Sequence, residues 1–319
     1  MKRKNNLYKD ICNLEHITYI YEKIEKNCKN KNKVYKWKSI KDVLITKIYR
    51  NLVHFDYQCG KYHQFVIYEP KRRVIRSQEM YNKVVNHLVS EYILLPSIVS
   101  CLVDSNVASR RGKGTSYGVK LYFKYRQYYD CKYGRDNYYL LKLDISKFFD
   151  SIDHEILKSK LRTRIKDKVA LHILDLIIDS TESGLPIGST TSQLFAIFYL
   201  DGIDKYIKEV LKIKCYIRYQ DDMLLIHDDK EYLKYCLSKI TEELDKLKLQ
   251  LNSKTRIYKS NENINFIGVR KNKKYSNIHR TRRKYKKNLK KYHCGEISLN
   301  SMISSRMNYF NRKKGVMIK

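Results

Sequence analysis

Residues 216–226 read Tyr-Ile-Arg-Tyr-Gln-Asp-Asp-Met-Leu-Leu-Ile, an apolar strand pattern that two adjacent aspartates interrupt at its centre. A second strand pattern, residues 138–145 (YYLLKLDI), carries Asp144 near its end. A carboxylate within a half-buried strand is costly unless something neutralises it, and adjacent carboxylates also repel each other. Mg2+ is suited to this task, because it takes oxygen ligands and keeps several of its waters. The pattern therefore indicates a metal site formed by Asp144, Asp221 and Asp222.

The spacing of these aspartates predicts a particular arrangement. If residues 216–226 form a hairpin beside the strand of Asp144, the three carboxylates can hold two Mg2+ ions, with Mn2+ as a substitute. Two such ions stabilise the attacking and leaving oxygens of phosphoryl transfer. The backbone carbonyl of Ile145 is expected to point to the same place. In the alternative interpretation Asp221 and Asp222 form an ordinary polar turn and Asp144 caps a helix.

The charge of the chain indicates a polyanionic partner. The 319 residues include 66 Lys+Arg against 33 Asp+Glu, a formal net charge of +33. Nucleic acid is the usual partner of such a chain, because each phosphate contact releases a condensed counterion. Residues 270–319 alone hold 17 Lys+Arg and one acid. A membrane surface is the weaker alternative, and AT-rich codon usage, which also fits the 29 tyrosines, is a purely compositional one.

Other classes of protein are excluded by composition. A hydrophobic content of 43% is enough to bury a core, which excludes general disorder. The N-terminus (MKRKNNLYKD) lacks an apolar signal core, and we find no apolar run long enough to span a membrane. The eight cysteines form no CxxC pair and lie near no histidine cluster, so neither zinc nor disulfide chemistry is indicated. We expect a cytoplasmic protein with no membrane partner.

Periodicity along the chain predicts an α+β fold. Helices are expected at residues 14–28, 78–99, 115–129, 154–162, 168–179, 191–210 and 230–248. Strands are expected at residues 64–69, 138–145, 214–226 with its central break, 255–259 and 264–269. Polar or glycine-containing turns are expected at residues 30–32, 109–115 and 184–188.

Seven short motifs along the chain form an ordered set. They are residues 71–75 (KRRVI), 107–118 (VASRRGKGTSYG), 141–157 (LKLDISKFFDSIDHEIL), 184–193 (GLPIGSTTSQ), 219–222 (YQDD), 251–255 (LNSKT) and 265–269 (NFIGV). In these motifs the chain resembles the reverse transcriptases, and specifically their bacterial group II intron-like branch. The resemblance runs from about residue 10 to residue 300, nearly the whole chain.

The resemblance implies a right-hand polymerase fold, with an α+β palm built on a small antiparallel sheet. An N-terminal extension and fingers would occupy residues 1–135, with residues 155–190 partly fingers and palm. The palm would occupy residues 136–260, and the primer grip and basic helical thumb residues 261–319.

The resemblance also implies roles for individual residues. Asp144, Ile145, Asp221 and Asp222 would hold the metal, and Phe149 would exclude a ribose 2′-hydroxyl, unless its ring simply packs in the core. Further nucleotide-binding candidates are Lys71, Arg73, Arg111, Lys113, Ile187 and Gln193. Candidates for contacts with primer and template are Gly268, Lys284 and Lys287.

The implied function is RNA-directed DNA synthesis, in which a dedicated structured RNA is copied into cDNA from dNTPs. Pro186-Ile187-Gly188 and Ser192-Gln193 depart from the commonest family pattern and are similar to diversity-generating retroelement enzymes. Those relatives use a small basic accessory protein, a further partner that the resemblance implies. One alternative is an antiphage defence enzyme, protein-primed or untemplated, that makes cDNA from a non-coding RNA. Another is an RNA-binding, maturase-like protein with a vestigial polymerase site.

Overall fold

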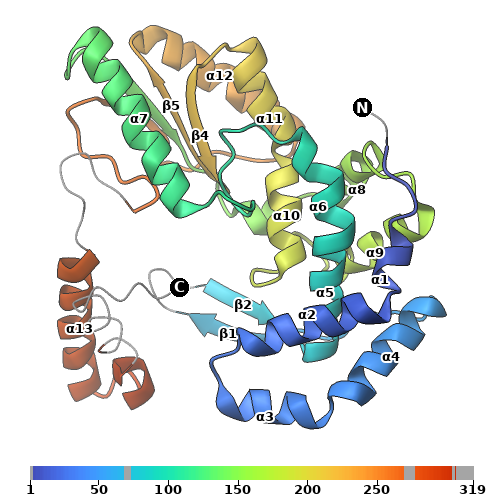
Figure 1. Ribbon diagram of the computed structural model, residues 1–319. Coiled ribbons are helices and arrows are strands. Elements are labelled where there is room, and N and C mark those ends of the chain that lie inside the picture. Colours follow the sequence, from blue (N-terminus) through green and yellow to red (C-terminus); the bar gives the residue numbers. More distant parts are fainter. Residues whose placement is uncertain (1–2, 68–72, 269–276, 304–305, 307–319) are drawn as a thin grey trace. The chain divides into compact units, whose positions relative to one another are not determined.

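The computed structural model describes residues 3–67, 73–268, 277–303 and 306 (Figure 1). The chain divides into two compact units, Met1–Ser260 and Asn261–Lys319, and each is described by itself. Unit 2 contains α13 (Asn277–His293), whose sequence includes eight Lys and Arg residues and no acid. All other elements named below belong to unit 1.

Unit 1 begins with four helices, α1 (Tyr8–Ile11), α2 (Leu14–Lys26), α3 (Lys31–Ser39) and α4 (Lys41–Val53). The side chain of Asn13 caps α2 by accepting the N–H groups of Glu15 and His16. The predicted turn at residues 30–32 is wrong, because Asn30 is the N-cap of α3 and the helix begins at Lys31.

A hairpin and a long helical run follow. Strands β1 (His63–Ile67) and β2 (Arg73–Ser77) pair antiparallel. Residues 80–101 then continue through α5 (Met80–Leu88), the π-helix η1 (Val89–Leu94), α6 (Leu95–Ile98) and the 3-10 turn η2 (Val99–Cys101). By length and composition this run could cross a membrane, contrary to the sequence analysis. Its most apolar window is 61% buried inside the protein, as in the core helix of a soluble protein, so the evidence for a span is weak.

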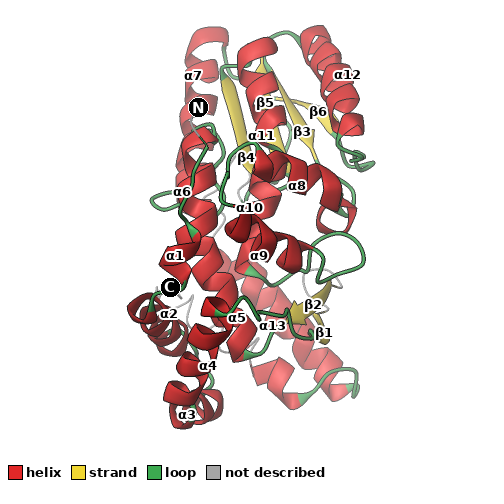
Figure 2. Ribbon diagram, turned by 90° about the vertical axis from the view of Figure 1, so that its right-hand side faces the viewer, coloured by secondary structure: helices red, strands yellow, loops and turns green. Residues whose placement is uncertain are grey.

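The central sheet has four antiparallel strands in the order β4-β5-β3-β6 (Figure 2). Their bounds are β3 (Tyr139–Leu143), β4 (Cys215–Tyr219), β5 (Asp222–His227) and β6 (Arg256–Lys259). Helix α12 (Lys230–Lys246) packs on β3, β5 and β6, and α7 (Thr115–Tyr133) packs on β4. The strands therefore bury apolar side chains against helices while their ends stay available for polar groups.

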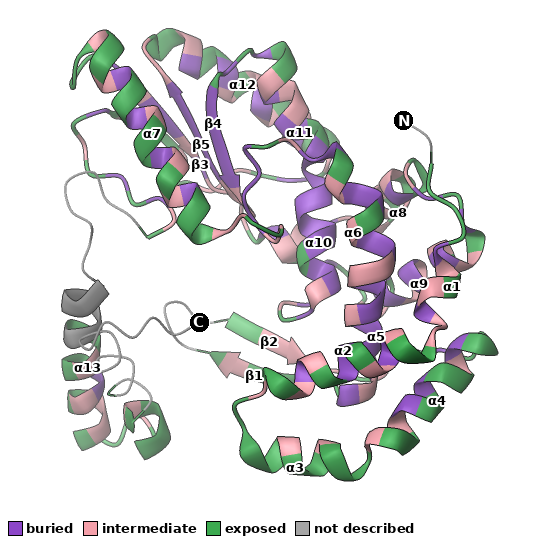
Figure 3. Ribbon diagram, in the orientation of Figure 1, coloured by how far each residue is buried: buried purple, intermediate pink, exposed green. Residues whose placement is uncertain are grey.

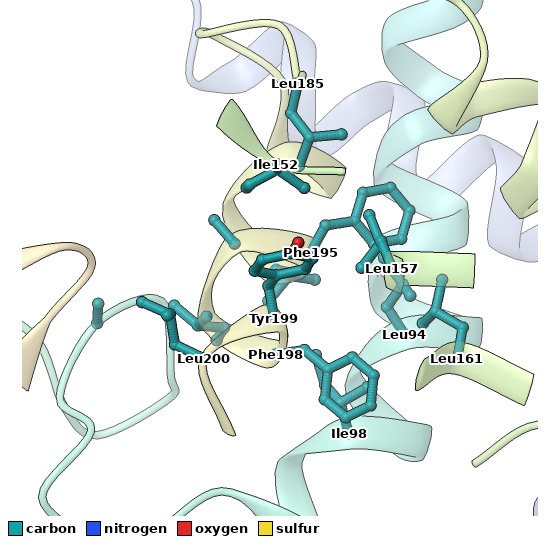
Figure 4. Packing of buried hydrophobic residues seen from close by; sticks show 14 of the residues in the cluster. Leu94, Ile98, Ile152, Leu157, Leu161, Leu185, Phe195, Phe198, Tyr199 and Leu200 are labelled. Atoms are coloured by element: carbon teal, nitrogen blue, oxygen red, sulfur yellow. The ribbon is translucent and has the colours of Figure 1, made fainter. Parts of the chain in front are cut away.

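The remaining helices build the core beside the sheet. They are η3 (Phe148–Ser151), α8 (His154–Arg162), α9 (Lys168–Ile178), α10 (Thr190–Tyr199), α11 (Asp201–Lys205) and the π-helix η4 (Tyr206–Val210). Helix α10 is buried nearly all round, and Figure 4 shows its Phe195 and Phe198 among leucine and isoleucine side chains of α6 and α8. Full burial of such a ring contributes about 1.5–3 kcal/mol.

One carboxylate joins the start of the chain to its middle. Oδ2 of Asp167 accepts the N–H groups of Leu7 and Tyr8, at 2.8 and 3.0 Å. Oδ1 of Asp167 accepts those of Val169 and Ala170 and so caps α9. Although burial opposes it, this set of hydrogen bonds lowers the pKa of Asp167. Asp167 thereby satisfies backbone donors from segments about 160 residues apart.

The α+β class predicted from the sequence is confirmed, and every predicted helix has a counterpart within a few residues. The predicted strand at residues 264–269 is wrong for its described part, residues 264–268. Phe266 forms only an isolated bridge there, because Ile267 and Gly268 take positive φ angles of 50° and 79° and turn the chain.

Candidate active site

The paired aspartates lie at the tip of the β4–β5 hairpin. Tyr219 pairs with Asp222, so Gln220 and Asp221 form the turn between the strands. Gln220 takes a φ of +57°, the left-handed conformation that so tight a connection requires. The hairpin that the sequence analysis assumed is thus present.

Asp144 lies beside this turn. Strand β3 pairs with β5 up to Leu143 and Met223, and the same register sets Asp144 opposite Asp222. Residues directly opposite each other in a sheet point to the same face. The fold therefore brings Asp144, Asp221 and Asp222 to one end of the sheet, as the sequence analysis expected.

The electrostatics of the turn disfavour the charged form of Asp221. Burial raises the pKa of Asp221 to about 6, and the negative charges of Asp222 and Asp144 act in the same direction. Arg73 at the start of β2 opposes them and lowers the pKa of Asp221. The carboxylate of Asp222 lies 3.2 Å from Nζ of Lys142. Lys142 thus supplies part of the compensating charge from within β3 itself.

The donor set fits a hard divalent cation, because it consists of carboxylate oxygens held close to other carboxylates. Within the described residues, no three His, Cys, Asp or Glu side chains lie close enough together to hold a metal ion as they stand. Ile145 forms an antiparallel bridge with Leu251 through its neighbours: Asn252 N–H donates to the Asp144 carbonyl, and Ser146 N–H donates to the Gln250 carbonyl. The Ile145 carbonyl takes no part in that ladder.

The buried ion pair between Arg218 and Asp204 supports the turn, and the sequence analysis did not identify this pair. Arg218 on β4 has no exposed surface and donates from Nε to Oδ1 of Asp204 at 2.6 Å. Its Nη1 donates to the carbonyl of Gln220 at 3.1 Å, and its Nη2 to that of Ile197 at 2.9 Å. The sequence did contain a signal for this pair: Arg218 lies within an apolar strand pattern, and a buried arginine must have a polar or charged partner.

A serine hydroxyl links the turn to two other motifs. Gln220 donates to Oγ of Ser109 at 3.0 Å, and that hydroxyl donates to Oε1 of Gln193 on α10 at 3.3 Å. The other polar atom of the Gln220 side chain, Oε1, is buried and has no partner among the described residues. Ser109 therefore connects the motif at residues 107–118 with the YQDD turn and with the motif at residues 184–193.

The loop before α10 contacts the β1–β2 hairpin. The Ile187 carbonyl accepts the N–H of Arg76 at 3.0 Å. Gly188 has a φ of +124°, and a Cβ at this position would lie 3.1 Å from the Arg76 carbonyl oxygen. The Ile187 backbone is thus fixed against β2, the strand that carries Arg73.

Phe149 lies on η3, five residues after Asp144, and its ring is half-buried against the core. Its centroid lies 5.6 Å from that of Phe148 in an edge-to-face arrangement. The Phe149 carbonyl accepts the N–H of Leu185 at 2.7 Å. Gly184 permits this approach, because a Cβ there would lie 2.6 Å from the Phe149 carbonyl oxygen. The partly open ring is compatible with both roles considered for Phe149.

Two of the basic residues predicted to bind phosphate form ion pairs with acidic side chains of the protein. Arg111 pairs with Glu91. Lys113 lies 2.9 Å from Asp104, and only 14% of its side chain is exposed. Of the other two basic candidates, Arg73 acts on Asp221 as described above, and Lys71 lies outside the described residues.

The primer and template candidates belong to unit 2. Gly268 is exposed in a turn, and Lys284 and Lys287 are exposed on α13. The roles of these three residues stay predictions.

Comparison with known proteins agrees with this geometry. A family profile described as reverse transcriptase (RNA-dependent DNA polymerase) matches residues 69–270. The matched residues include Asp144 after β3, the β4–β5 hairpin with Asp221 and Asp222, and the motif at residues 184–193 between them. Two telomerase structures from Candida tropicalis, one apo and one in complex with a TWJ fragment of telomeric RNA, share the fold. Each has a TM-score of 0.50, at 16% and 15% identity, over 76% and 88% of this chain and 54% and 56% of those chains.

The fold is therefore that of a right-hand polymerase, built on an antiparallel palm sheet. The family match extends over more than half of the sequence, and the chain belongs to the reverse transcriptases, which are RNA-directed DNA polymerases and generally metal-dependent.

Two curated relatives match locally. The COX1/OXI3 intron 2 protein of Saccharomyces cerevisiae is 32% identical over 81 residues, 22% of this chain and 10% of that protein. The retron Ec73 reverse transcriptase of Escherichia coli is 33% identical over 102 residues, 28% of this chain and 32% of that protein. The matched segments thus span about a tenth and about a third of these relatives.

Proposed function

We propose that this chain synthesises DNA on an RNA template at Asp144, Asp221 and Asp222. The observation that carries the proposal is the register of the palm sheet, which sets Asp144 opposite Asp222 and next to the half-buried Asp221. The raised pKa of Asp221 supports it, because a bound cation would stabilise the charged carboxylate that burial and the neighbouring aspartates disfavour.

Each part of the site has a task in this proposal. Asp144, Asp221, Asp222 and the Ile145 carbonyl hold Mg2+, which supplies charge stabilisation at the reacting phosphate when bound. Arg73 orients the phosphates of the incoming dNTP, because it lies within electrostatic reach of Asp221. Phe149 excludes ribonucleotides by occupying the space of a 2′-hydroxyl. The Arg218–Asp204 pair keeps the turn in position by holding the Gln220 carbonyl.

The test is Mg2+-dependent incorporation of labelled dTTP on poly(rA) primed with oligo(dT). In the double variant Asp221→Asn, Asp222→Asn the rate of incorporation should fall by at least about a thousand-fold, because the variant lacks two of the carboxylates proposed to bind the cation. The matched control is Asp228→Asn, Asp229→Asn, which removes two adjacent charges from the opposite end of β5. Asp229 is the N-cap of α12, and an asparagine side chain serves equally well in that role. Undiminished incorporation by the first variant would refute the site.

For the biological role we propose diversity generation, with the enzyme copying a dedicated structured RNA in the cytoplasm together with a small basic accessory protein. The support is the Pro186-Ile187-Gly188 loop and Ser192-Gln193, which are similar to those of diversity-generating enzymes. Antiphage defence is the second candidate, and the local similarity to a retron reverse transcriptase is compatible with it. A maturase-like protein without synthesis is the third.

Sequencing of the RNA and cDNA that copurify with the chain separates these roles. A cDNA of a nearby gene segment with substitutions concentrated at template adenines supports diversity generation. A faithful, repetitive or untemplated product that increases on phage infection supports defence. Bound RNA without any cDNA supports the maturase-like role.

A further inference from the structure

Helix α3 carries lysines without counter-charges. Its sequence, KNKVYKWKS, contains four lysines and no acid, whereas α12 contains four lysines and four acids. On α12, Lys234 pairs with Glu231 at 2.9 Å and Lys239 with Glu242 at 2.8 Å. Across the part of the chain that the structure describes, no ion pair is found for Lys31, Lys33 or Lys36. Lys38 lies 4.0 Å from Glu25 of α2. The self-repulsion among the other three lysines of α3 is therefore not offset by ion pairs within the described residues.

The two faces of α3 differ in kind. Val34 and Trp37, three residues apart, are the positions that α3 partly buries, and the Trp37 carbonyl accepts the hydroxyl of Tyr21 on α2 at 2.6 Å. Lys33 and Lys36, also three residues apart, are exposed, and Figure 3 shows that most of the helix is exposed. Tyr35 projects from another side of the helix, because residues one or two positions apart do not face each other, and 79% of its surface is exposed.

This combination has a specific chemical use. Lysines at helical spacing contact successive phosphates, and an exposed tyrosine ring stacks on a base that is not paired. The surroundings add to the charge, since residues 26–50 hold nine Lys+Arg and one acid. We propose that the exposed surface of α3 that carries Lys33, Lys36 and Tyr35 is a binding surface for unpaired RNA, separate from the site of the aspartates.

An anionic membrane is the competing partner for a basic helix. A helix that lies on a membrane turns its apolar residues outward into the lipid. In α3 the apolar Val34 and Trp37 are the partly buried residues, and the outward face is polar apart from one tyrosine. The arrangement favours RNA. This proposal rests on the proposed function only in that RNA is the template, and it does not depend on which residues bind the metal.

The first experiment measures binding of the full chain to a 20-nucleotide oligo(U) RNA over a range of salt concentrations. In Lys33→Gln, Lys36→Gln the slope of log affinity against log salt should fall by roughly 1.4, about 0.7 for each phosphate contact on a single strand. The control Lys234→Gln, Lys239→Gln makes the same change in net charge on α12 and should leave the slope nearly unchanged. Equal slopes in the two variants would overturn the proposal.

The second experiment tests stacking. Tyr35→Leu should weaken binding of oligo(U) by about five-fold or more and binding of a 20-base-pair RNA duplex much less, because only unpaired bases stack on a side chain. The control is Tyr235→Leu on α12, where 52% of the tyrosine is exposed. Equal losses on both RNAs, or no loss, would overturn the role of Tyr35.

Two further readouts keep the outcomes apart. If the α3 variants keep their affinity for RNA but no longer sediment with phosphatidylserine vesicles, the surface binds membranes and the proposal is wrong. Incorporation on poly(rA) primed with oligo(dT) is measured in parallel. A chain that lacks incorporation but shows the changed salt slope supports the RNA surface while refuting the proposed polymerase site.

Discussion

Arg218 Nε donates to Asp204 Oδ1 across 2.6 Å, and neither side chain has any exposed surface. The same Oδ1 also accepts the hydroxyl of Tyr216 at 2.7 Å. A buried pair of this kind contributes little net stability, but loss of one partner leaves a charge buried alone. Since Arg218 also holds the Gln220 carbonyl, its position determines that of the turn before Asp221.

We therefore expect Asp204→Asn to lower the free energy of unfolding by about 3–5 kcal/mol and to reduce dNTP incorporation. Urea unfolding followed by circular dichroism measures the first effect. As a control, Lys246→Gln breaks an exposed pair with Glu243 and should cost under about 1 kcal/mol. Equal costs for the two variants would show that the buried pair is not what supports the turn.

Gly184 and Gly112 have similar backbone conformations, with φ angles of +61° and +71°, but different surroundings. An alanine Cβ at Gly184 would lie 2.6 Å from backbone atoms of Phe149 and Asp150, whereas nothing lies within 4 Å at Gly112. Gly112→Ala should cost only the left-handed strain, about 1 kcal/mol. Gly184→Ala should cost clearly more and should slow dNTP incorporation, because the loop must separate from η3. Thermal unfolding and a primer-extension assay on both variants check this.

His87 is a pH-dependent element of unit 1. Burial lowers its pKa to about 4, and the charges of Lys83 and Lys23 add to this effect. The unfolded chain takes up the proton near pH 6.5 and the folded chain only near pH 4, so stability falls as the pH is lowered through this window. The loss attributable to His87 is about 3 kcal/mol.

His87→Gln should remove this loss. The difference in unfolding free energy between the two proteins, measured in urea at about pH 7 and about pH 4.5, isolates the His87 contribution. The comparison is needed because Asp221, whose pKa is raised to about 6, changes stability in the opposite direction between its unfolded and folded pKa values. A pH-independent difference would contradict the prediction.

Phe149→Val should open the space beside the sugar. We expect the ratio of ribonucleotide to deoxyribonucleotide incorporation to rise by about ten-fold or more, because removal of one steric contact relaxes such a selection. Phe123→Val on α7, a partly exposed phenylalanine, is the control. A fall in overall activity with an unchanged ratio would assign Phe149 to core packing alone.

The sequence predicted the parts of this site that depend on local patterns. The strand pattern around Asp221 and Asp222 predicted a hairpin, and the carboxylates within apolar strands predicted their convergence with Asp144. The hairpin is confirmed, because period and turn chemistry are local properties, and the register sets Asp144 opposite Asp222. The metal site itself stays a prediction. The resemblance to reverse transcriptases added the class, which the family match confirms.

Other features depended on partners distant in the sequence. Asp204 lies on a different element from Arg218, so nothing in the pattern of β4 identifies it. The pairing of Arg111 with Glu91, 20 residues away, likewise arises from a tertiary contact. Lys113 and Asp104 are only 9 residues apart, but they lie in irregular chain that has no periodic pattern to predict their pairing. Helix α3 was mistaken for a turn at its start, because Asn30 is both a turn former and an N-cap.

The four hydrogen bonds accepted by Asp167 have a consequence for the order of folding. During synthesis Leu7 and Tyr8 leave the ribosome long before Asp167, and their N–H groups have no such acceptor until it follows. At roughly 5–20 residues per second, this delay is about 10–30 seconds. This contact closes a loop of about 160 residues, so the first segment of the chain cannot complete it until about half of the sequence has been synthesised.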